Sequence, residues 1–170
     1  MRRTEYDFLT WQSFPSSAKL IRDESGWTFW PWIKTIPVSP GVTVKASFKA
    51  KQQNVVSTPS HVKFEGWDGS RWVDGFGAPL KTPRGLPFGS FDWTDFTGLH
   101  EQTIPPGFSA MRVTVVGGGG TPEAPSITWF DDLRIYQDDV LIYAGDFSNW
   151  APIIIPAQII TGVAMIKFIK

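Results

Sequence analysis

The sequence predicts an all-β protein folded as an antiparallel β-sandwich. Its 170 residues include nine Trp, thirteen Phe, fourteen Pro and sixteen Gly, so strand-favouring aromatic residues are interrupted at short intervals by turn formers. Apolar residues recur at every second position in several segments, and no segment has the 3.6-residue spacing of a helix. This combination is typical of short strands joined by tight turns, and the length suits one domain.

Charge and cysteine content exclude several classes of function. The chain has no Cys, so it has neither a disulfide framework nor a thiolate metal site. Its formal net charge is zero, so it lacks the basic surface of a nucleic-acid binder, and we expect no nucleic-acid partner. The first twelve residues, MRRTEYDFLTWQ, lack the apolar run of a signal peptide. Either the protein is not exported by that route or its signal is not part of this sequence.

The first forty residues predict an arm followed by strands that lie at sheet edges. Residues 1–16 have no sustained period, and we interpret them as an arm with one strand. Ser17–Arg22 is a short strand that ends at the polar turn Asp23–Gly26. The aromatic stretch Trp27–Val38 contains two prolines, each of which removes a ladder donor, so it suits an edge strand or a bulged segment.

The middle of the chain contains the clearest strand signal. In Val42–Lys51 apolar and polar residues alternate strictly, which predicts one face on the core and one face in solvent. His61–Trp67 and Arg71–Val73 flank Asp68–Gly69, a strong turn dipeptide, and predict a hairpin. Gly75–Gly89 is rich in Gly and Pro and is predicted to be a loop, of a length that is usually functional or mobile.

The last part of the predicted sandwich ends in a hairpin. Phe91–Ile104 and Phe108–Val116 are predicted strands, and Gly117–Pro125 is a loop. Ser126–Tyr143 is predicted to form two strands joined by a turn at Gln137–Asp139. Strict alternation along the first of them would place Asp131 in one row with four apolar residues, Ile127, Trp129, Leu133 and Ile135. A carboxylate in a core-facing row must be hydrogen-bonded, paired or bound to a metal.

The C-terminal residues 146–170 are predicted to be a separate apolar arm. The run APIIIPAQIITGVAMIKFIK is nearly as long as a membrane helix, but two prolines, a glutamine and a glycine interrupt it, and its Ile and Val favour strands. We expect one or two strands packed on this sandwich or on a partner, with an irregular packed tail as the second interpretation and a membrane segment as the third. The arm's apolar residues are Ile153, Ile154, Ile155, Ile159, Ile160, Val163, Met165, Ile166 and Phe168.

Three stretches carry a resemblance to a known family. They are Trp32–Val44 running into SFKAK, Trp93–Val115, and Thr128–Tyr136 with its closing motif TWFDDLRIY. Together they resemble the jelly-roll carbohydrate-binding modules appended to cellulases and xylanases, which are galactose-binding-like β-sandwiches. The family's opening Asn-Gly-x-Phe-Glu strand is not recognisable, and its domain normally ends near Tyr136, whereas this chain continues to Lys170. We therefore expect an arm at 1–16, a jelly roll at 17–145 and an apolar arm at 146–170.

The resemblance implies two kinds of site. An aspartate at the Asp131–Asp132 position often helps to hold a structural calcium ion in the family. The first-strand partner is missing here, so we expect no cofactor and keep calcium as the alternative. The modules bind glycans by stacking flat aromatic side chains on sugar rings. Tryptophans in irregular segments are the candidates here, although core packing or a protein interface would equally explain them. These candidates are Trp27, Trp30, Trp32, Trp67, Trp72 and Trp93, whereas Trp129 is expected in the core.

No catalytic pattern stands out, and we expect no enzyme. The two histidines, His61 and His100, have no adjacent ligand or nucleophile pattern. The run Gly117–Gly120 lacks the ending of a phosphate-binding loop. The carboxylates that a glycosidase pair would need fall in polar or turn positions, where solvated charges are ordinary. They are Glu65, Asp68, Asp92, Asp95 and Glu101.

Three functions fit these features. The one we expect is a non-catalytic structural protein of an assembly, as a decoration, tail or capsid-associated component of a virus or phage particle. Similar jelly rolls recur in such particles, lysis needs no signal peptide, and the apolar arm would pair with neighbouring subunits or copies of the chain. The alternative is a free-standing glycan-binding module on an extracellular surface. The third, a membrane-anchored module, is disfavoured by the prolines in the arm.

Overall fold

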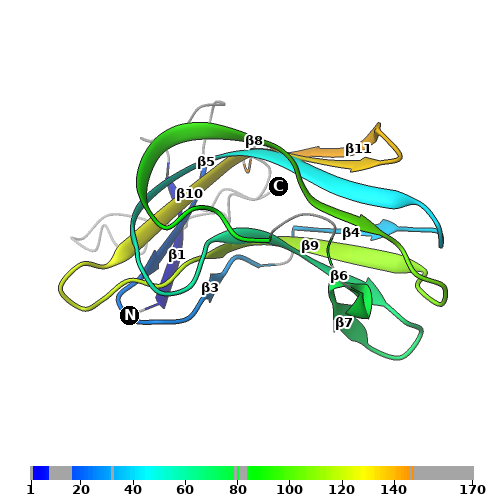
Figure 1. The fold of residues 1–170 in the computed structure, drawn as a ribbon, viewed down its shortest axis with the longest axis horizontal. Helices are drawn as coiled ribbons and strands as arrows, with labels where there is room; N and C mark the ends of the chain where they lie inside the picture. The colour runs from blue at the N-terminus through cyan, green and yellow to red at the C-terminus, as the bar shows by residue number, and fades with distance from the viewer. Residues whose placement is uncertain are drawn as a thin grey trace, which may run out of the picture.

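Two antiparallel sheets form the fold in a computed structural model, which describes residues 2–7, 17–31, 33–78, 80, 84–145 and 147 (Figure 1). One short 3-10 turn, η1 (Gly75–Gly77), lies between β7 and β8. In chain order the strands are β1 (Arg2–Asp7), β2 (Ser17–Arg22), β3 (Thr28–Phe29), β4 (Lys34–Pro37), β5 (Thr43–Val55), β6 (His61–Trp67), β7 (Trp72–Asp74), β8 (Gly89–Thr103), β9 (Ala110–Gly117), β10 (Ser126–Gln137) and β11 (Val140–Gly145).

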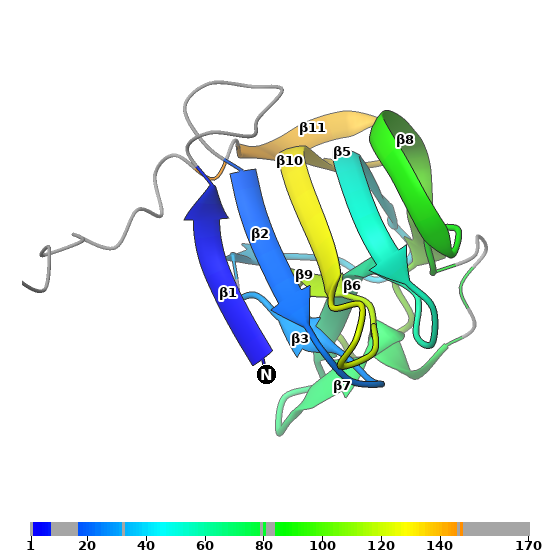
Figure 2. The same ribbon diagram turned by 90° about the vertical axis from the view of Figure 1, so that its left-hand side faces the viewer.

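The strand order is that of a jelly-roll sandwich, which confirms the predicted fold class. Sheet A has the order β1-β2-β10-β5-β8, and β11 pairs with the distal half of β10 (Figure 2). Sheet B has the order β3-β9-β6-β7, and β4 also pairs with β9. Neighbours in both sheets are mostly strands far apart in the chain, so long-range pairing dominates. Within the described residues there is no helix long and apolar enough to span a membrane.

Alternation along the central strands builds the core between the two sheets. On β5, Val44, Ala46, Phe48 and Ala50 are buried, and the residues between them face outward, as predicted. Sheet B contributes the inward rows of β6 and β9. Burial of such side chains is the main favourable term in folding, at about 25 cal/mol per Å² of apolar surface. The largest fully buried apolar side chains are Phe64, Phe130, Leu20, Ile33, Ile104, Met111, Leu133, Ile135 and Val44.

A β-bulge in β10 overturns one prediction. Phe130 lies opposite Ala50 and Ala18 in the core row, so Trp129, opposite Lys51 and Lys19, faces the other side of sheet A. The register then shifts by one residue between Asp131 and Arg134, with Asp132 at φ 49°, which returns Leu133 to the core. The prediction that Trp129 and Asp131 share one row with Leu133 and Ile135 is therefore wrong, because one inserted residue reverses the alternation. The side chains of Trp129 and Asp131 are nevertheless both buried, as predicted.

The predicted hairpins are confirmed, and the chain enters the core once more after β11. The β10–β11 turn has positive φ at Asp138 (42°) and Asp139 (68°), as a two-residue hairpin turn requires. Phe147 is buried and packs edge-on against Trp30, with 6.0 Å between ring centroids. The apolar residues of the arm, from Ile153 to Phe168, lie outside the described residues.

Candidate functional site

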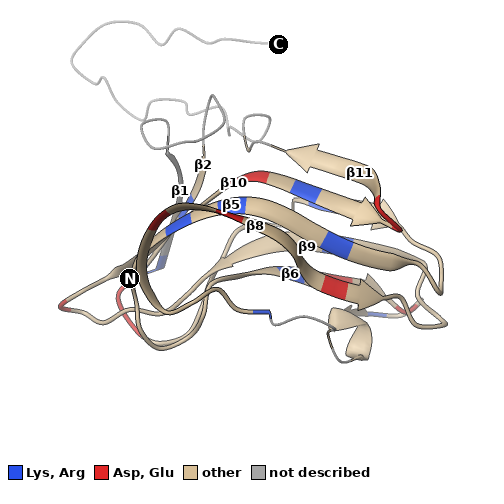
Figure 3. Ribbon diagram, turned by 45° about the horizontal axis from the view of Figure 1, so that its top comes forward, with Lys and Arg blue, Asp and Glu red and all other residues tan. Residues whose placement is uncertain are grey.

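The outer face of sheet B carries polar and aromatic side chains in register. Phe29 on β3, Val116 on β9 and His61 on β6 are opposite one another and form one row. Glu65 and Arg112 form a later row on the same face. Basic and acidic segments consequently lie side by side on this sheet (Figure 3). The strict alternation of β6 is what brings its polar residues to one face.

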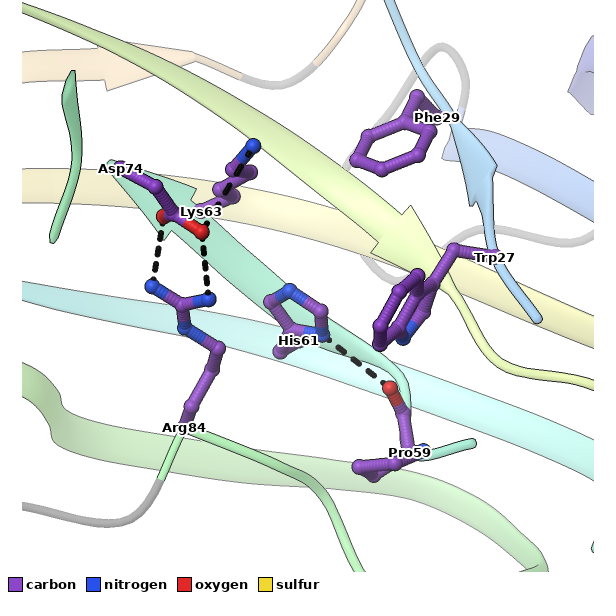
Figure 4. Close-up of a pocket in the computed structure, with 7 residues that line it drawn as sticks. All are labelled: Trp27, Phe29, Pro59, His61, Lys63, Asp74 and Arg84. Carbon is purple, nitrogen blue, oxygen red and sulfur yellow. Dashed lines mark hydrogen bonds and ion pairs between the residues drawn. The ribbon is translucent and has the colours of Figure 1, made fainter. Parts of the chain in front are cut away.

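A pocket of about 140 Å³ lies on this face, beside β3 and the start of β6 (Figure 4). Two flat rings form one side of it, Trp27 at 44% and Phe29 at 48% exposure. Large apolar rings this exposed beside a pocket are available to a ligand. The pocket's full lining, here called the sheet B pocket, is Trp27, Phe29, Pro59, His61, Lys63, Asp74 and Arg84.

Charged side chains on the other side of the sheet B pocket hold one another in place. Arg84 donates two hydrogen bonds to the Asp74 carboxylate, at 3.1 and 2.8 Å. Lys63 donates to Glu65 at 2.6 Å, lies 3.9 Å from Asp74, and its Nζ sits 5.4 Å from the centroid of the Phe29 ring. Burial acts to raise the pKa of Asp74, but the hydrogen bond and charge of Arg84 hold it below its ordinary value.

One histidine, His61, lines the pocket, and a second, His100, is stacked beneath it. His61 lies parallel to His100, with 6.1 Å between ring centroids and 8° between planes, and Trp27 meets His61 edge-on. Burial lowers the pKa of His61 to about 4 and that of His100 to about 3. Both rings are therefore neutral near pH 7, and their hydrogen bonds with Pro59 O and Arg84 O, each 3.1 Å long, assign Nδ1–H to His61 and Nε2–H to His100.

The loop that carries Arg84 is tied to the sandwich by buried polar side chains. His100 Nε2 donates to the carbonyl of Arg84 itself, and Gln102 Nε2 donates to the carbonyls of Gly75 and Ala78. The Leu86 amide donates to Ser60 O at 2.8 Å. The loop predicted at Gly75–Gly89 thus holds a pocket residue in a defined position.

A second aromatic group lies further along the same face. Trp67 and Trp72 meet across the β6–β7 hairpin with 5.4 Å between ring centroids. The Arg112 guanidinium lies 4.5 Å from the centroid of the Trp72 ring and donates to Glu65 at 2.9 and 2.5 Å. This is an ordered cation–π arrangement at the edge of sheet B.

The structure separates the predicted tryptophans. Trp27 lines the sheet B pocket, and Trp67 with Trp72 lies on the same face. Trp30 is only 4% exposed and packs in the core, so it was wrongly predicted as a sugar contact. Trp93 is half-buried on β8 of the opposite sheet, and Trp32 lies outside the described residues.

Sequence reasoning missed most of the pocket. The alternation of β6 was a usable signal for His61 and Lys63, and Phe29 stands two positions after Trp27. No pattern of neighbouring residues predicts Asp74 or Arg84, because a hairpin and a loop bring these two residues to the sheet B pocket. Asp74 and Arg84, together with Lys63, supply every charged group of the pocket.

The Asp131–Asp132 pair stays a prediction as a calcium site. Asp131 is fully buried, and its Oδ1 accepts a hydrogen bond from the Asp132 amide at 2.7 Å. Asp132 is held by Arg134 at 3.0 Å. Over the ranges that the structure describes, no three His, Cys, Asp or Glu side chains gather around one point.

Comparisons with known proteins give fold similarities. No protein-family model matches the chain, and no curated protein matches it. Among the solved structures that are similar in fold are three with identities of 16% or less. One is the enzymatically active domain of bacteriophage CBA120 tailspike protein 4, with a TM-score of 0.45 and 16% identity over 84% of this chain. This chain spans only 18% of that tailspike chain.

The other two similar structures are carbohydrate-binding modules. The CBM22-1 xylan-binding domain of Paenibacillus barcinonensis Xyn10C has a TM-score of 0.47 and 12% identity, over 85% of this chain and 83% of its own. A CBM4 module has a TM-score of 0.44 and 10% identity, over 80% of this chain and 90% of its own. The chain's own strand order is that of a jelly-roll sandwich. The likeness concerns the fold alone.

Proposed function

We propose that this protein is a non-catalytic glycan-binding module and that the sheet B pocket holds one sugar ring. The observation that carries the proposal is the pairing of two exposed rings, Trp27 and Phe29, with fixed polar groups across a small pocket. A pyranose ring has an apolar face and a rim of hydroxyls, so it needs an aromatic surface and oriented donors and acceptors. Both are present within one pocket.

The charge balance of the pocket favours a neutral sugar. The cations Lys63 and Arg84 are matched by the carboxylates of Asp74 and the adjacent Glu65. The lowered pKa of His61 leaves its ring uncharged near pH 7. A volume of about 140 Å³ is well below the roughly 300 Å³ of a small drug-sized site, so one ring or one chain end would occupy it.

The state of the carboxylates supports binding without catalysis. A glycosidase needs a general acid whose pKa is raised, facing a second carboxylate. Asp74 has a lowered pKa and is held by Arg84. Glu65 is engaged on one oxygen by Lys63 and on the other by Arg112. Neither group is poised to give a proton to a glycosidic oxygen.

Affinity electrophoresis against soluble glucans, xylans and cell-wall glycans tests the proposal, followed by calorimetry on any glycan retained. Trp27→Ala and Phe29→Ala should each weaken binding about tenfold or more, which corresponds to about 1.4 kcal/mol. Phe88→Ala is the matched control, because Phe88 is an aromatic residue of 59% exposure that does not line the pocket. No retention by any glycan, or an equal loss in the Phe88 variant, would contradict the proposal.

We also propose, as a second and compatible function, that the protein is a structural component of an assembly such as a virus or phage particle. The observation that favours it is the tip of the β10–β11 hairpin, where Val140 and Leu141 are 65% and 50% exposed. Exposed apolar side chains of this kind, in a chain whose C-terminal sequence is also apolar, suit contacts with neighbouring subunits. The protein would then act on a virion or an extracellular surface.

The assembly role is tested by the oligomeric state of the full chain and of a chain that ends at Phe147. The shortened chain keeps Phe147 because this residue packs in the core against Trp30. Light scattering after size-exclusion chromatography should give an oligomer for the full chain and a monomer for the shortened one. Monomers in both cases would contradict the assembly role and leave the glycan proposal standing.

A further inference from the structure

A second pocket lies on the outer face of sheet A, on the side of the sandwich away from the sheet B pocket. Its volume is about 150 Å³. It is lined by residues of three neighbouring strands, β5, β8 and β10. The full lining, here called the sheet A pocket, is Ser47, Phe48, Lys49, Asp95, Phe96, Thr97, Asp132, Arg134 and Tyr136.

Two bulges that flank one position of β5 create this pocket. On the β10 side the pairing passes from Lys49–Asp131 to Ser47–Arg134, so β10 carries one extra residue. On the β8 side it passes from Phe48–Phe96 to Ala46–Leu99, so β8 carries one extra residue as well. Each bulge makes a strand kink beside Ser47, and bulges often lie next to functional sites, where they redirect side chains.

The β10 bulge holds one backbone conformation that is costly for its residue type. Asp132 has φ 49°, in the left-handed region that non-glycine residues rarely adopt, and Gly98 in the opposite bulge has φ 71°. The Gly98 amide donates to Ser47 Oγ at 3.4 Å, which ties the two strands together. The conformation at Asp132 places its carboxylate beside Arg134 at the pocket wall.

The lining offers polar groups that the described part of the protein does not use. Lys49 and Asp95 are opposite each other in the β5–β8 register, yet among the described residues neither makes an ion pair. This contrasts with the sheet B pocket, whose lysine and aspartate are both engaged. An ammonium group and a carboxylate that face one pocket without ion-pair partners can donate to and accept from the same ligand.

The chemistry of the lining selects a neutral, hydroxyl-rich ligand. Two cations, Lys49 and Arg134, are balanced by two carboxylates, so neither an anion such as phosphate nor a cation is favoured. The polar lining is unsuited to an apolar peptide. A carboxylate accepts hydrogen bonds from sugar hydroxyls, and a lysine donates hydrogen bonds to them. We infer that the sheet A pocket is a second saccharide site, independent of the sheet B pocket, which makes the domain bivalent.

The test uses the full chain and conservative variants on each side. Asp95→Asn and Tyr136→Phe remove polar function from the sheet A pocket with little change in volume. Asp92→Asn is the matched control, because Asp92 is an exposed carboxylate of the same strand, pairs with Lys51 at 2.9 Å and does not line the pocket. The probes are soluble neutral oligosaccharides of xylose, glucose, mannose and galactose, with calorimetric stoichiometry and amide chemical shifts as readouts.

We expect two sugars per wild-type chain and shifts at the amides of Thr97 and Gly98. Asp95→Asn or Tyr136→Phe should weaken one of the two binding events at least tenfold and leave the other, and Asp92→Asn should leave both. Trp27→Ala should remove the other binding event, the one at the sheet B pocket. Loss of all binding in Trp27→Ala with no change in Asp95→Asn overturns the second site and leaves the first. Loss of all binding in Asp95→Asn with no change in Trp27→Ala refutes the sheet B site and keeps the sheet A site. If no probe shifts the amides of Thr97 and Gly98, the sheet A site is overturned.

Discussion

The stacked histidines beneath the sheet B pocket predict a loss of stability in mildly acidic solution. Their folded pKa values, about 4 for His61 and about 3 for His100, lie below the unfolded value of 6.5. As the pH falls below 6.5, the unfolded chain binds protons on both rings and the folded chain does not. The free energy of unfolding therefore falls, and it recovers only as the pH rises through 6.5.

The size of this stability loss follows from the difference between the folded and unfolded pKa values of the two histidines. Each histidine changes the free energy of unfolding by about 1.4 kcal/mol per pH unit between the folded and unfolded pKa values. From pH 6.5, where the unfolded rings are half protonated, to pH 5 the two together should remove about 3 kcal/mol, a large share of the roughly 5–15 kcal/mol of a typical domain. This window lies above the ordinary carboxyl pKa values, so histidine dominates it.

The contacts of His100 explain why its ring resists a second proton. Its Nε2–H donates to Arg84 O, and within the described residues the buried Nδ1 has no hydrogen-bond partner. A proton on Nδ1 would thus be buried without an acceptor, and its positive charge would lie on a ring stacked against His61. Near it lie Arg84 and Lys63, whose charges oppose protonation of the pair, and Asp74, which favours it.

Urea unfolding at pH 5 to 8 measures the effect in the wild type and in His100→Asn. Asn suits this position, because His100 has φ 58° and Asn tolerates that region well. The variant should lose about half as much stability over pH 6.5 to 5, about 1.5 kcal/mol instead of about 3. The chain has only two histidines, so the His61→Asn/His100→Asn double variant should show almost no loss in this window. An undiminished loss in the double variant, or ring resonances that titrate near pH 6.5 in the folded state, would refute the reasoning.

Two further predictions concern the sandwich itself. Gly66→Ala should lower stability by about 1–3 kcal/mol in urea, because a Cβ there would come within 2.2 Å of Phe76 and 2.6 Å of Phe108 in the core; an unchanged urea midpoint would contradict this packing. EDTA should leave the melting temperature unchanged, because the Asp132 carboxylate is already engaged within its own strand; a clear fall on chelation would instead indicate a bound metal at the β10 aspartates.

Local signals were enough to predict most strands and turns. The alternation of Val42–Lys51, the Asp68–Gly69 turn and the Asp138–Asp139 hairpin are each set by neighbouring residues, and the structure contains all of them. Prediction from alternation failed where a single inserted residue decides which face of the strand a side chain occupies. The bulge after Asp131 reverses the row of Trp129 because side chains alternate with a period of two, and no local residue marks the insertion.

The sequence by itself determined the fold class, the strand alternation and the set of aromatic residues from which a binding site could be built. Which tryptophan faces a ligand was decided only by the tertiary structure, which buries Trp30 against Phe147 and leaves Trp27 exposed beside Phe29. The polar half of the sheet B pocket comes from a hairpin and a loop that follow Trp27 by dozens of residues, and the sheet A pocket arises from two bulges on either side of β5. Long-range strand pairing brings these residues together, so the pattern of neighbouring residues in the sequence does not predict the two pockets.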